Sequence, residues 1–260
     1  MQAENSRPPI LCFGGLDPSG GAGLQADIET ISHCGGHALP IATCLTVQNT
    51  TQTSASTSVE PKIIQQQTEA LLSDINPAAC KIGVVPNQPI ATIIANILAQ
   101  IPDIPIVLDP VLSASSGISF VDKETIHAIK RYLLPNATVI TPNANELKIL
   151  ADSTSSDKNN AQTLCALGPK YVLVTRADRP TDDVTNTLYS KNNNEIEFHS
   201  PRLPHTYHGS GCTLSSAISC FLAHGLNIAD CIDSAQEFTY RSLQHAEPLG
   251  KGQWIPKRAH

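Results

Sequence analysis

A short glycine-rich turn at residues 208–213 holds the side chains best suited to chemistry. It reads His-Gly-Ser-Gly-Cys-Thr and leads into small and apolar residues that predict a helix. Such a turn presents free backbone N–H groups and the positive end of the helix dipole, which together bind anions. The thiol of Cys212 is expected to have a lowered pKa there, so it could act as a base or nucleophile. Gly209, Ser210, Gly211 and Cys212 are therefore candidate catalytic residues, although a tight turn with a buried cysteine fits the local pattern equally well.

A second glycine-rich segment, residues 14–23, follows a predicted strand and opens a predicted helix. From residue 21 it matches the relaxed dinucleotide-binding pattern Gly-x-Gly-x-x-Ala. That kind of site also needs an acidic residue at the end of the second strand, where this chain has Val-Gln-Asn, so a nicotinamide or flavin site is not expected. Glycines still let a ligand approach the backbone closely. Gly21 is a candidate ligand-binding residue for this reason, and Asp17 and Asp27 are candidate hydrogen-bond acceptors.

Polar side chains follow other predicted strands. Gln48 offers an acceptor and two donors, which suits a heterocycle with an amino group beside a ring nitrogen, although ordinary loop polarity explains it as well. Asn143 and Glu146 lie where a strand leads into a helix, and Asp109 follows another strand. Such oxygen ligands hold a hydrated Mg²⁺ that bridges phosphates. Asn143 and Glu146 also fit a capping box, and the two roles are compatible.

Composition excludes several classes of function. The 260 residues, 41% hydrophobic and 15% charged, suit a single domain over residues 1–260. The net charge of −6 gives no basic footprint for nucleic acid. Eight cysteines without a CxxC pair predict reduced thiols in a cytoplasmic protein rather than a zinc site. No signal peptide or membrane-spanning run is indicated. Lys251, Lys257 and Arg258 are interpreted as a solvated tail.

Short apolar runs alternate with longer helix-like segments, which predicts a doubly wound α/β fold with a mostly parallel sheet and helices on both faces. The expected strands are Ile10–Phe13, Leu39–Val47, Ala79–Val85, Ile104–Leu108, Thr138–Ile140 and Tyr171–Val174. Thr185–Tyr189 and Glu195–His199 are expected to form an antiparallel edge hairpin. The expected helices are Gly21–Cys34, Lys62–Asp74, Pro89–Ile101, Lys123–Leu133, Asn143–Leu150, Asn159–Leu167, Gly211–His224 and Ile228–His245, with residues 153–160 as a loop.

Ligands bind beyond the carboxyl ends of the strands in such sheets. The polar clusters described above follow strands, as do residues 176–178, so they are expected to converge on one site. The chain has no Gly-x4-Gly-Lys-Ser/Thr phosphate loop, no GxSxG elbow and no HExxH helix, which excludes the common NTPase, hydrolase and zinc-protease motifs.

Taken together, the motifs resemble the hydroxymethylpyrimidine/phosphomethylpyrimidine kinases of thiamin synthesis, in the ribokinase-like superfamily. The resemblance runs from about Ile10 to Trp254. It rests on the segments 17–27, Thr46-Val-Gln-Asn-Thr50, Lys81-Ile-Gly83, Leu108-Asp-Pro-Val111, Thr141-Pro-Asn-x-x-Glu146, 208–213 and Gly250-Lys-Gly252. The cysteine at 212 is the marker of the pyrimidine branch, shared with some pyridoxal kinases, since sugar kinases of the superfamily carry aspartate there.

The resemblance implies ATP-dependent phosphorylation of 4-amino-5-hydroxymethyl-2-methylpyrimidine and then of its monophosphate. It implies that the turn 209–212 binds the transferring phosphoryl group and that Cys212 takes the hydroxyl proton. Gln48 and Asp27 would hold the pyrimidine ring, with Val84 against its face. Asn143 and Glu146 would manage Mg²⁺. A homodimer is also expected, because two-fold dimers are the commonest oligomers.

The chain departs from the family pattern on the nucleotide side. Thr175 and Arg176 stand where a lysine and a glycine are usual, Ser115 replaces a second lysine, and Val84 replaces a methionine. Arg176 is the candidate substitute for a lysine near the ATP phosphates, although the two side chains are not interchangeable. Two alternatives follow: pyridoxal kinase activity on the same scaffold, and a pyrimidine-binding protein without catalysis.

Overall fold

The computed structural model describes residues 7–113, 120–177 and 181–259. These residues form one nine-stranded sheet in the order β3-β2-β1-β4-β5-β6-β7-β8-β9. β1, β2, β4, β5, β6 and β7 run parallel, whereas β3 pairs antiparallel with β2, and β8 and β9 extend the other edge antiparallel. The strands are β1 (Pro9–Leu16), β2 (His37–Gln48), β3 (Thr53–Ser58), β4 (Ala79–Ile82), β5 (Ile106–Leu108), β6 (Val139–Ile140), β7 (Tyr171–Val174), β8 (Asp183–Ser190) and β9 (Glu195–Pro201).

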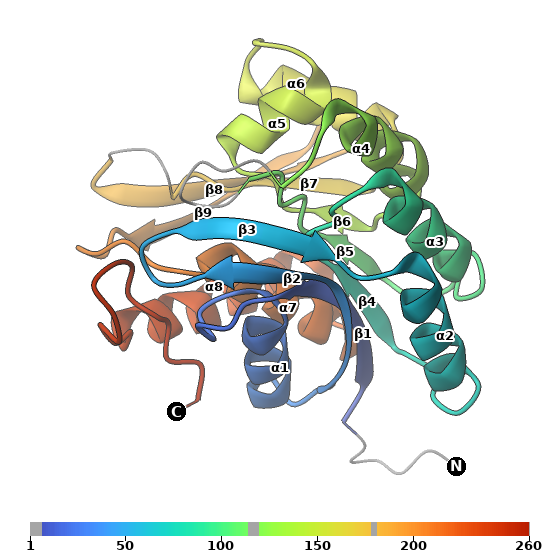
Figure 1. The fold of residues 1–260 in the computed structure, drawn as a ribbon. Coiled ribbons are helices and arrows are strands. Elements are labelled where there is room, and N and C mark those ends of the chain that lie inside the picture. Colours follow the sequence, from blue (N-terminus) through green and yellow to red (C-terminus); the bar gives the residue numbers. More distant parts are fainter. Residues whose placement is uncertain (1–6, 114–119, 178–180, 260) are drawn as a thin grey trace.

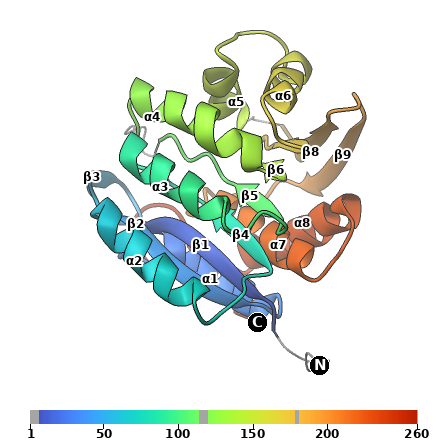
Figure 2. The same cartoon turned by 90° about the vertical axis from the view of Figure 1, so that its right-hand side faces the viewer.

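Helices cover both faces of the sheet (Figures 1 and 2). α1, α7 and α8 pack on one face, and α2 to α6 pack on the other. The helices are α1 (Gly23–His33), α2 (Pro61–Leu72), α3 (Gln88–Leu98), α4 (Lys123–Ala128), α5 (Ala144–Ala151), α6 (Asp157–Ala166), α7 (Ser210–Ala223) and α8 (Ile228–Gln244). α4 continues into a π-helical turn (Ile129–Leu133) and a 3₁₀ turn (Leu134–Asn136).

Alternation along β1 explains how one strand serves two cores. Leu11 and Phe13 point into the core under α2 and α3, whereas Ile10 and Cys12 point into the core under α1. Successive side chains of a strand face opposite sides, so a central strand of this fold is apolar throughout. Its carboxyl end therefore delivers Gly14 and Gly15 to the rim of the sheet. The doubly wound fold predicted from the sequence is confirmed.

The sequence missed one edge of the sheet. The hairpin of β8 and β9 is confirmed, but β3 was not expected, because Thr-Ser-Ala-Ser-Thr-Ser carries no apolar alternation. Only its first residue is buried, so backbone pairing with β2 holds it in place. The sheet consequently has an antiparallel strand at both edges. The loop expected at residues 153–160 was also too long, because Ser156 caps α6, which begins at Asp157.

The interpretation of residues 251–258 as a solvated tail is wrong for Arg258. Its side chain is 1% exposed, the largest of those fully buried. The chain before it is tied to the fold, because His208 N–H donates to Trp254 O and Trp254 N–H donates to Thr206 O, both at 2.9 Å. Within the described residues, no helix is both long and apolar enough to cross a membrane.

Candidate active site

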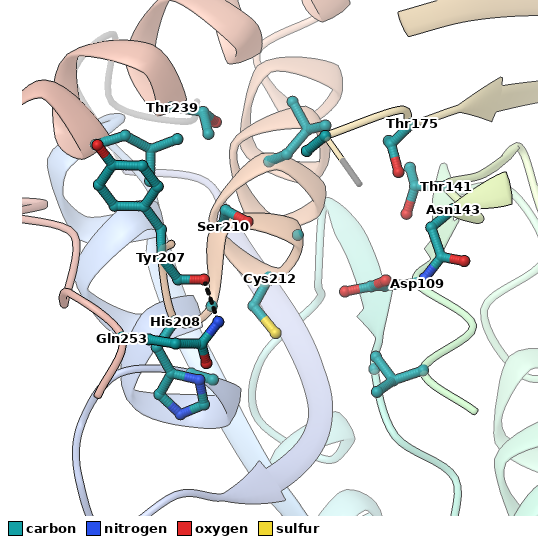
Figure 3. Close-up of a pocket in the computed structure, with 18 of the residues that line it drawn as sticks. Asp109, Thr141, Asn143, Thr175, Tyr207, His208, Ser210, Cys212, Thr239 and Gln253 are labelled. Atoms are coloured by element: carbon teal, nitrogen blue, oxygen red, sulfur yellow. Dashed lines mark hydrogen bonds between the residues drawn. The ribbon is translucent and has the colours of Figure 1, made fainter. Parts of the chain in front are cut away.

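A cavity of about 660 Å³ opens at the carboxyl ends of the parallel strands. Figure 3 shows Asp109, Thr141 and Thr175 on one side of it and Tyr207 on the other, with Cys212 between them. The expected convergence of strand-end residues is therefore present. The cavity lining includes, among the predicted site residues, Asp17, Gln48, Val84, Asp109, Asn143, Glu146, Thr175, Gly209, Ser210, Gly211 and Cys212. Gly21, Asp27 and Arg176 do not line it.

The turn at 208–213 has the expected form of an anion site. Gly209 is the N-cap of α7 and has a left-handed backbone, with φ of 78°, which favours glycine. The N–H of Thr213 makes the first helical hydrogen bond, to Gly209 O at 2.9 Å. The N–H groups of Ser210, Gly211 and Cys212 therefore precede the hydrogen-bonded ladder of the helix at the cavity wall. They are positioned to receive an anion at the positive end of α7.

The two glycine-rich turns lie directly against each other. A Cβ atom on Gly209 would lie 2.1 Å from the carbonyl oxygen of Gly21, and one on Gly21 would lie 2.2 Å from the ring of His208. No side chain fits at either position. Gly21 is thus a packing residue between the turns rather than part of the cavity wall.

Asp17 joins the same two turns through its side chain. It accepts hydrogen bonds from Ser19 N–H at 2.8 Å and Ala22 N–H at 2.9 Å, and it pairs with His208 Nε2 at 2.8 Å. Burial alone would raise the pKa of Asp17, but the hydrogen bonds from His208 and Ser19 outweigh burial and lower it. The carboxylate therefore stays ionised and clamps residues 17–22 to His208.

A buried ion pair lies beneath the cavity. Lys81 Nζ on β4 lies 2.9 Å from Asp27 Oδ1 on α1, and Ser216 Oγ on α7 donates to the same oxygen at 2.7 Å. The side chains of Lys81 and Asp27 are 1% and 0% exposed. The prediction that Asp27 contacts the ligand ring is not supported by this position, because its carboxylate lies behind the cavity wall. Instead Asp27 holds Lys81, which does line the cavity.

The expectation of a lowered pKa for Cys212 is wrong. Burial, together with the charges of Asp109 and Asp27, raises the pKa of Cys212 to about 11, although Lys81 acts in the opposite direction. Desolvation and two carboxylates therefore outweigh the nearby cation. Cys212 is a neutral thiol at pH 7 in the protein without ligands.

Oxygen atoms suited to a divalent cation lie on the opposite wall. Glu146 completes the predicted capping box: its Oε2 accepts from Asn143 N–H at 2.9 Å, and Asn143 Oδ1 accepts from Glu146 N–H at 2.9 Å. Asp109, 5% exposed, accepts a hydrogen bond from Ser215 Oγ at 3.1 Å. The buried hydroxyl of Thr141 has no hydrogen-bond partner. Among the described residues, however, no three His, Cys, Asp or Glu side chains group closely enough to hold a metal by themselves.

Arg176 does not replace the lysine expected near phosphate. Its Nε donates to Asp157 Oδ2 at 3.1 Å and its Nη1 to Thr187 Oγ1 at 2.5 Å, so its guanidinium is tied to α6 and β8. Burial alone would lower its pKa, but Tyr189 and Asp157 raise it. Thr175 does line the cavity. Ser115 and residue 178 lie outside the described residues.

Lys81 is a site residue that the sequence reasoning quoted only as part of a motif. The signal was a single lysine inside the otherwise uncharged strand Ala79–Ile82. Its positive charge acts on Asp27, Cys212 and Asp109, and although burial alone would lower the pKa of Lys81, these groups raise it. Among the described residues, Lys81 and Arg202 are the lysine and arginine side chains that line the cavity.

Replacing Lys81 by methionine is expected to lower the free energy of unfolding by about 3–5 kcal/mol, because it leaves Asp27 buried and unpaired. Urea denaturation at pH 7 measures this. The matched control is Lys158→Met, which breaks the exposed 3.1 Å pair with Glu195 and should cost less than about 1 kcal/mol. Adding Asp27→Asn to Lys81→Met should recover part of the loss. Equal losses in the Lys81 and Lys158 variants would contradict this account.

The fold and the site together define a class. A doubly wound sheet with a strand-end cavity, a glycine turn at a helix N-terminus and carboxylates opposite it is the arrangement of a ribokinase-like small-molecule kinase. Comparison with known proteins gives the same class. The family model described as phosphomethylpyrimidine kinase matches residues 17–256. The chain therefore belongs to the phosphomethylpyrimidine kinase family, and it is a phosphotransferase.

Individual relatives agree with this family. The hydroxymethylpyrimidine/phosphomethylpyrimidine kinase of Mycobacterium leprae is 32% identical over 253 residues, covering 94% of this chain and 91% of that protein. The protein of the same description from Synechococcus elongatus is 33% identical, with 95% of each chain covered. Among solved structures, phosphomethylpyrimidine kinase from Clostridium difficile is 33% identical, with a TM-score of 0.78 over 90% of this chain and 98% of that one. An ADP complex of Bacillus subtilis pyridoxal kinase is 27% identical, with a TM-score of 0.87 over 97% and 98%.

Proposed function

We propose that this kinase transfers the γ-phosphoryl group of ATP to the hydroxymethyl group of 4-amino-5-hydroxymethyl-2-methylpyrimidine, and then phosphorylates the monophosphate to the diphosphate, in thiamin biosynthesis. The observation that carries the proposal is the family match over residues 17–256, together with a cavity that holds the glycine turn and the Cys212 thiol. Phosphoryl transfer needs positioning and charge neutralisation rather than covalent catalysis, which suits these groups.

The pyrimidine binds between Gln48 and Val84 in this proposal. Gln48 lines the cavity at the end of β2, and its Oε1 already accepts from Thr53 Oγ1 at 2.8 Å. That hydrogen bond fixes the amide, leaving its NH₂ group to donate to a ring nitrogen. Val84 presents an apolar surface, 8% exposed, to the ring. Asp27 takes no part in ring binding in this proposal; its carboxylate holds Lys81 at the cavity.

The phosphoryl group binds at the N–H groups of Ser210, Gly211 and Cys212 while it is transferred. The thiolate form of Cys212, a minor fraction at pH 7, accepts the proton of the attacking hydroxyl and becomes the thiol. Lys81 below it balances the negative charge of the thiolate. Arg202 and Thr175 are the proposed contacts of the nucleotide, since both line the cavity and Arg176 does not. The residues present fit a hydrated Mg²⁺: Asp109, Glu146 and Asn143 offer oxygen ligands, and the unpartnered hydroxyl of Thr141 lies beside them. The ion would neutralise phosphate charge when bound.

A steady-state assay with the purified protein tests the substrate. ATP consumption should depend on the hydroxymethylpyrimidine, and the monophosphate should be a second acceptor. The alternative is pyridoxal phosphorylation, favoured by the similarity to the Bacillus subtilis pyridoxal kinase. A higher kcat/KM for pyridoxal than for the pyrimidine would support that alternative, and pyrimidine binding without any ATP turnover would mean a protein without catalysis.

A homodimer is also proposed, through an apolar patch formed by Leu16, Leu45 and Val47. These side chains are 45%, 50% and 60% exposed, Leu16 lies opposite Leu45 in the sheet, and Leu45 and Val47 share one face of β2. Exposed apolar patches commonly mark interfaces, and a two-fold axis would bury the patch against its own copy. Val47→Lys should give monomers in analytical ultracentrifugation, whereas Ile196→Lys, at a 42% exposed isoleucine on β9 at the other edge of the sheet, should not. A monomeric wild-type protein would contradict this proposal.

A further inference from the structure

Arg258 is buried although its immediate neighbour is exposed. Lys257 reaches the surface and lies 3.6 Å from Glu247, with half of its side chain accessible. Arg258 turns inward to an exposure of 1%. An arginine is always charged, and burying a charge is costly unless the charge is paired and hydrogen-bonded. The partners of this guanidinium therefore show what the burial achieves.

The first partners of Arg258 lie on the turn at residues 17–23. Nη2 donates to the carbonyl oxygen of Gly21 at 2.5 Å, and Nη1 donates to that of Gly20 at 3.5 Å. Nη1 also lies 3.2 Å from Glu29 Oε2 on α1, which compensates the charge. The guanidinium thus holds two consecutive carbonyl groups of this turn against α1.

The remaining nitrogen of Arg258 reaches the other glycine-rich turn. Nε donates to Thr213 Oγ1 at 2.9 Å, and that hydroxyl in turn donates to Gly209 O at 2.9 Å. Thr213 is fully buried. Because Gly209 is the N-cap of α7, this relay fixes the residue from which the anion-binding N–H groups begin.

One atom is shared by both sets of contacts. The Gly21 carbonyl that Arg258 holds is the group that leaves no room for a side chain on Gly209. Arg258 therefore acts where the two turns touch. For folding stability alone, an apolar side chain of similar volume would fill this space about as well. The planar guanidinium of arginine differs because it fixes the distances and directions between the groups it binds on the two turns.

The geometry points to Arg258 as a positioning residue, which sets the placement of the 17–23 turn against the 208–213 turn and so aligns the anion site of α7 with the bound acceptor. This inference rests on the proposed function for its kinetic consequence, although the structural consequence stands independently. Arg258 does not line the cavity, so it acts through the turns rather than on the substrate.

Steady-state kinetics of Arg258→Met test the inference. We expect kcat to fall about tenfold to a hundredfold, because displacing reacting groups by about 1 Å has effects of that size. The KM for the pyrimidine should change by less than about threefold, because Gln48 and Val84 do not contact Arg258 and ground-state binding is kept. Arg258→Lys keeps the positive charge but loses the planar guanidinium that binds both turns, so it should give a kcat between those of Arg258→Met and the wild type.

The matched control is Lys257→Met, which should have the kcat and KM of the wild type. A merely structural role would lower the active fraction, so kcat would recover fully after normalisation to folded protein, and that result would overturn the inference.

Hydrogen–deuterium exchange supplies a readout that needs no substrate. In Arg258→Met, amides of residues 19–24 and 206–213 should exchange faster, while those of β4 and α3 should be unchanged, and Lys257→Met should leave both turns protected. Unchanged exchange in the two turns, or faster exchange throughout the chain, would overturn the inference. If the wild-type protein does not phosphorylate the pyrimidine, the proposed function fails, and the exchange result still decides the role of Arg258.

Discussion

Cys212→Ala is expected to lower kcat for the pyrimidine by about a hundredfold to ten-thousandfold, the range that a positioned general base contributes. Alanine keeps the helix start and the backbone N–H groups of the turn, so the anion site remains while the proton acceptor is lost. The matched control is Cys220→Ala, which removes a buried thiol from the same helix away from the cavity and should leave kcat unchanged. A kcat for Cys212→Ala within about threefold of the wild type would exclude Cys212 as the base.

The raised pKa of Cys212 adds a pH dependence to this prediction. The thiolate is the form that accepts a proton, and with a pKa of about 11 only about one thiol in a thousand is ionised at pH 8. The rate should therefore rise about tenfold per pH unit between pH 7 and 9. Cys212→Asp supplies a carboxylate that is ionised throughout this range, so the slope should disappear. A wild-type profile that is flat from pH 7 to 9 would contradict the predicted ionisation.

Alkaline pH is expected to unfold the protein steeply above about pH 9. Cys12, Cys44, Cys80, Cys220 and Cys231 are fully buried, and burial raises the pKa of each, to about 11 for Cys44 and to about 12 for Cys220 and Cys231. These thiols ionise near pH 8.5–9 in the unfolded chain but stay protonated in the folded one. Their contribution to stability is thus complete below the unfolded pKa and is lost as pH rises.

The size of this effect follows from linkage. Each thiol that is ionised only in the unfolded chain lowers the free energy of unfolding by about 1.4 kcal/mol per pH unit, so five together approach about 7 kcal/mol per unit between pH 9 and 11. That is comparable with the whole stability of a typical domain, about 5–15 kcal/mol. Urea denaturation under reducing conditions at pH 8, 9 and 10 measures the slope. Cys220→Ala/Cys231→Ala should make it shallower by about 3 kcal/mol per unit. Equal stability at pH 8 and pH 10 would disprove the prediction.

The two predictions constrain each other experimentally. The pH dependence of catalysis must be measured below pH 9, where the buried thiols keep the fold intact. The same desolvation raises the pKa of Cys212 and of the core thiols, but among the cysteines that the structure describes only Cys212 lines the cavity, where Lys81, Asp109 and Asp27 act on it. Its chemistry therefore depends on the buried charges beneath it.

Local sequence was enough to predict the parallel strands, the β8–β9 hairpin and most of the cavity wall, whereas the edge strand β3 was missed. Apolar runs bounded by glycine, proline and asparagine located the parallel strands, because a buried strand must be apolar on both faces. Since parallel strands end at one edge of the sheet, Asp17, Gln48, Asp109 and Asn143 were predicted to converge. The turn at 208–213 was recognised from glycine spacing alone. All of these are properties of neighbouring residues and of a periodicity that the chain carries in itself.

The tertiary structure decided the electrostatics and the links between distant segments. Lys81 meets Asp27 across 54 residues, and Arg258 meets Gly21 across 237. Nothing local to either residue indicates such a partner, so Arg258 was expected in solvent and Asp27 in the cavity. The pKa of Cys212 was likewise predicted in the wrong direction, because it depends on burial and on carboxylates brought in by α1 and β5. Spacing along the chain determines which side chains reach the rim of the sheet, whereas desolvation and long-range pairing arise only when the segments pack together.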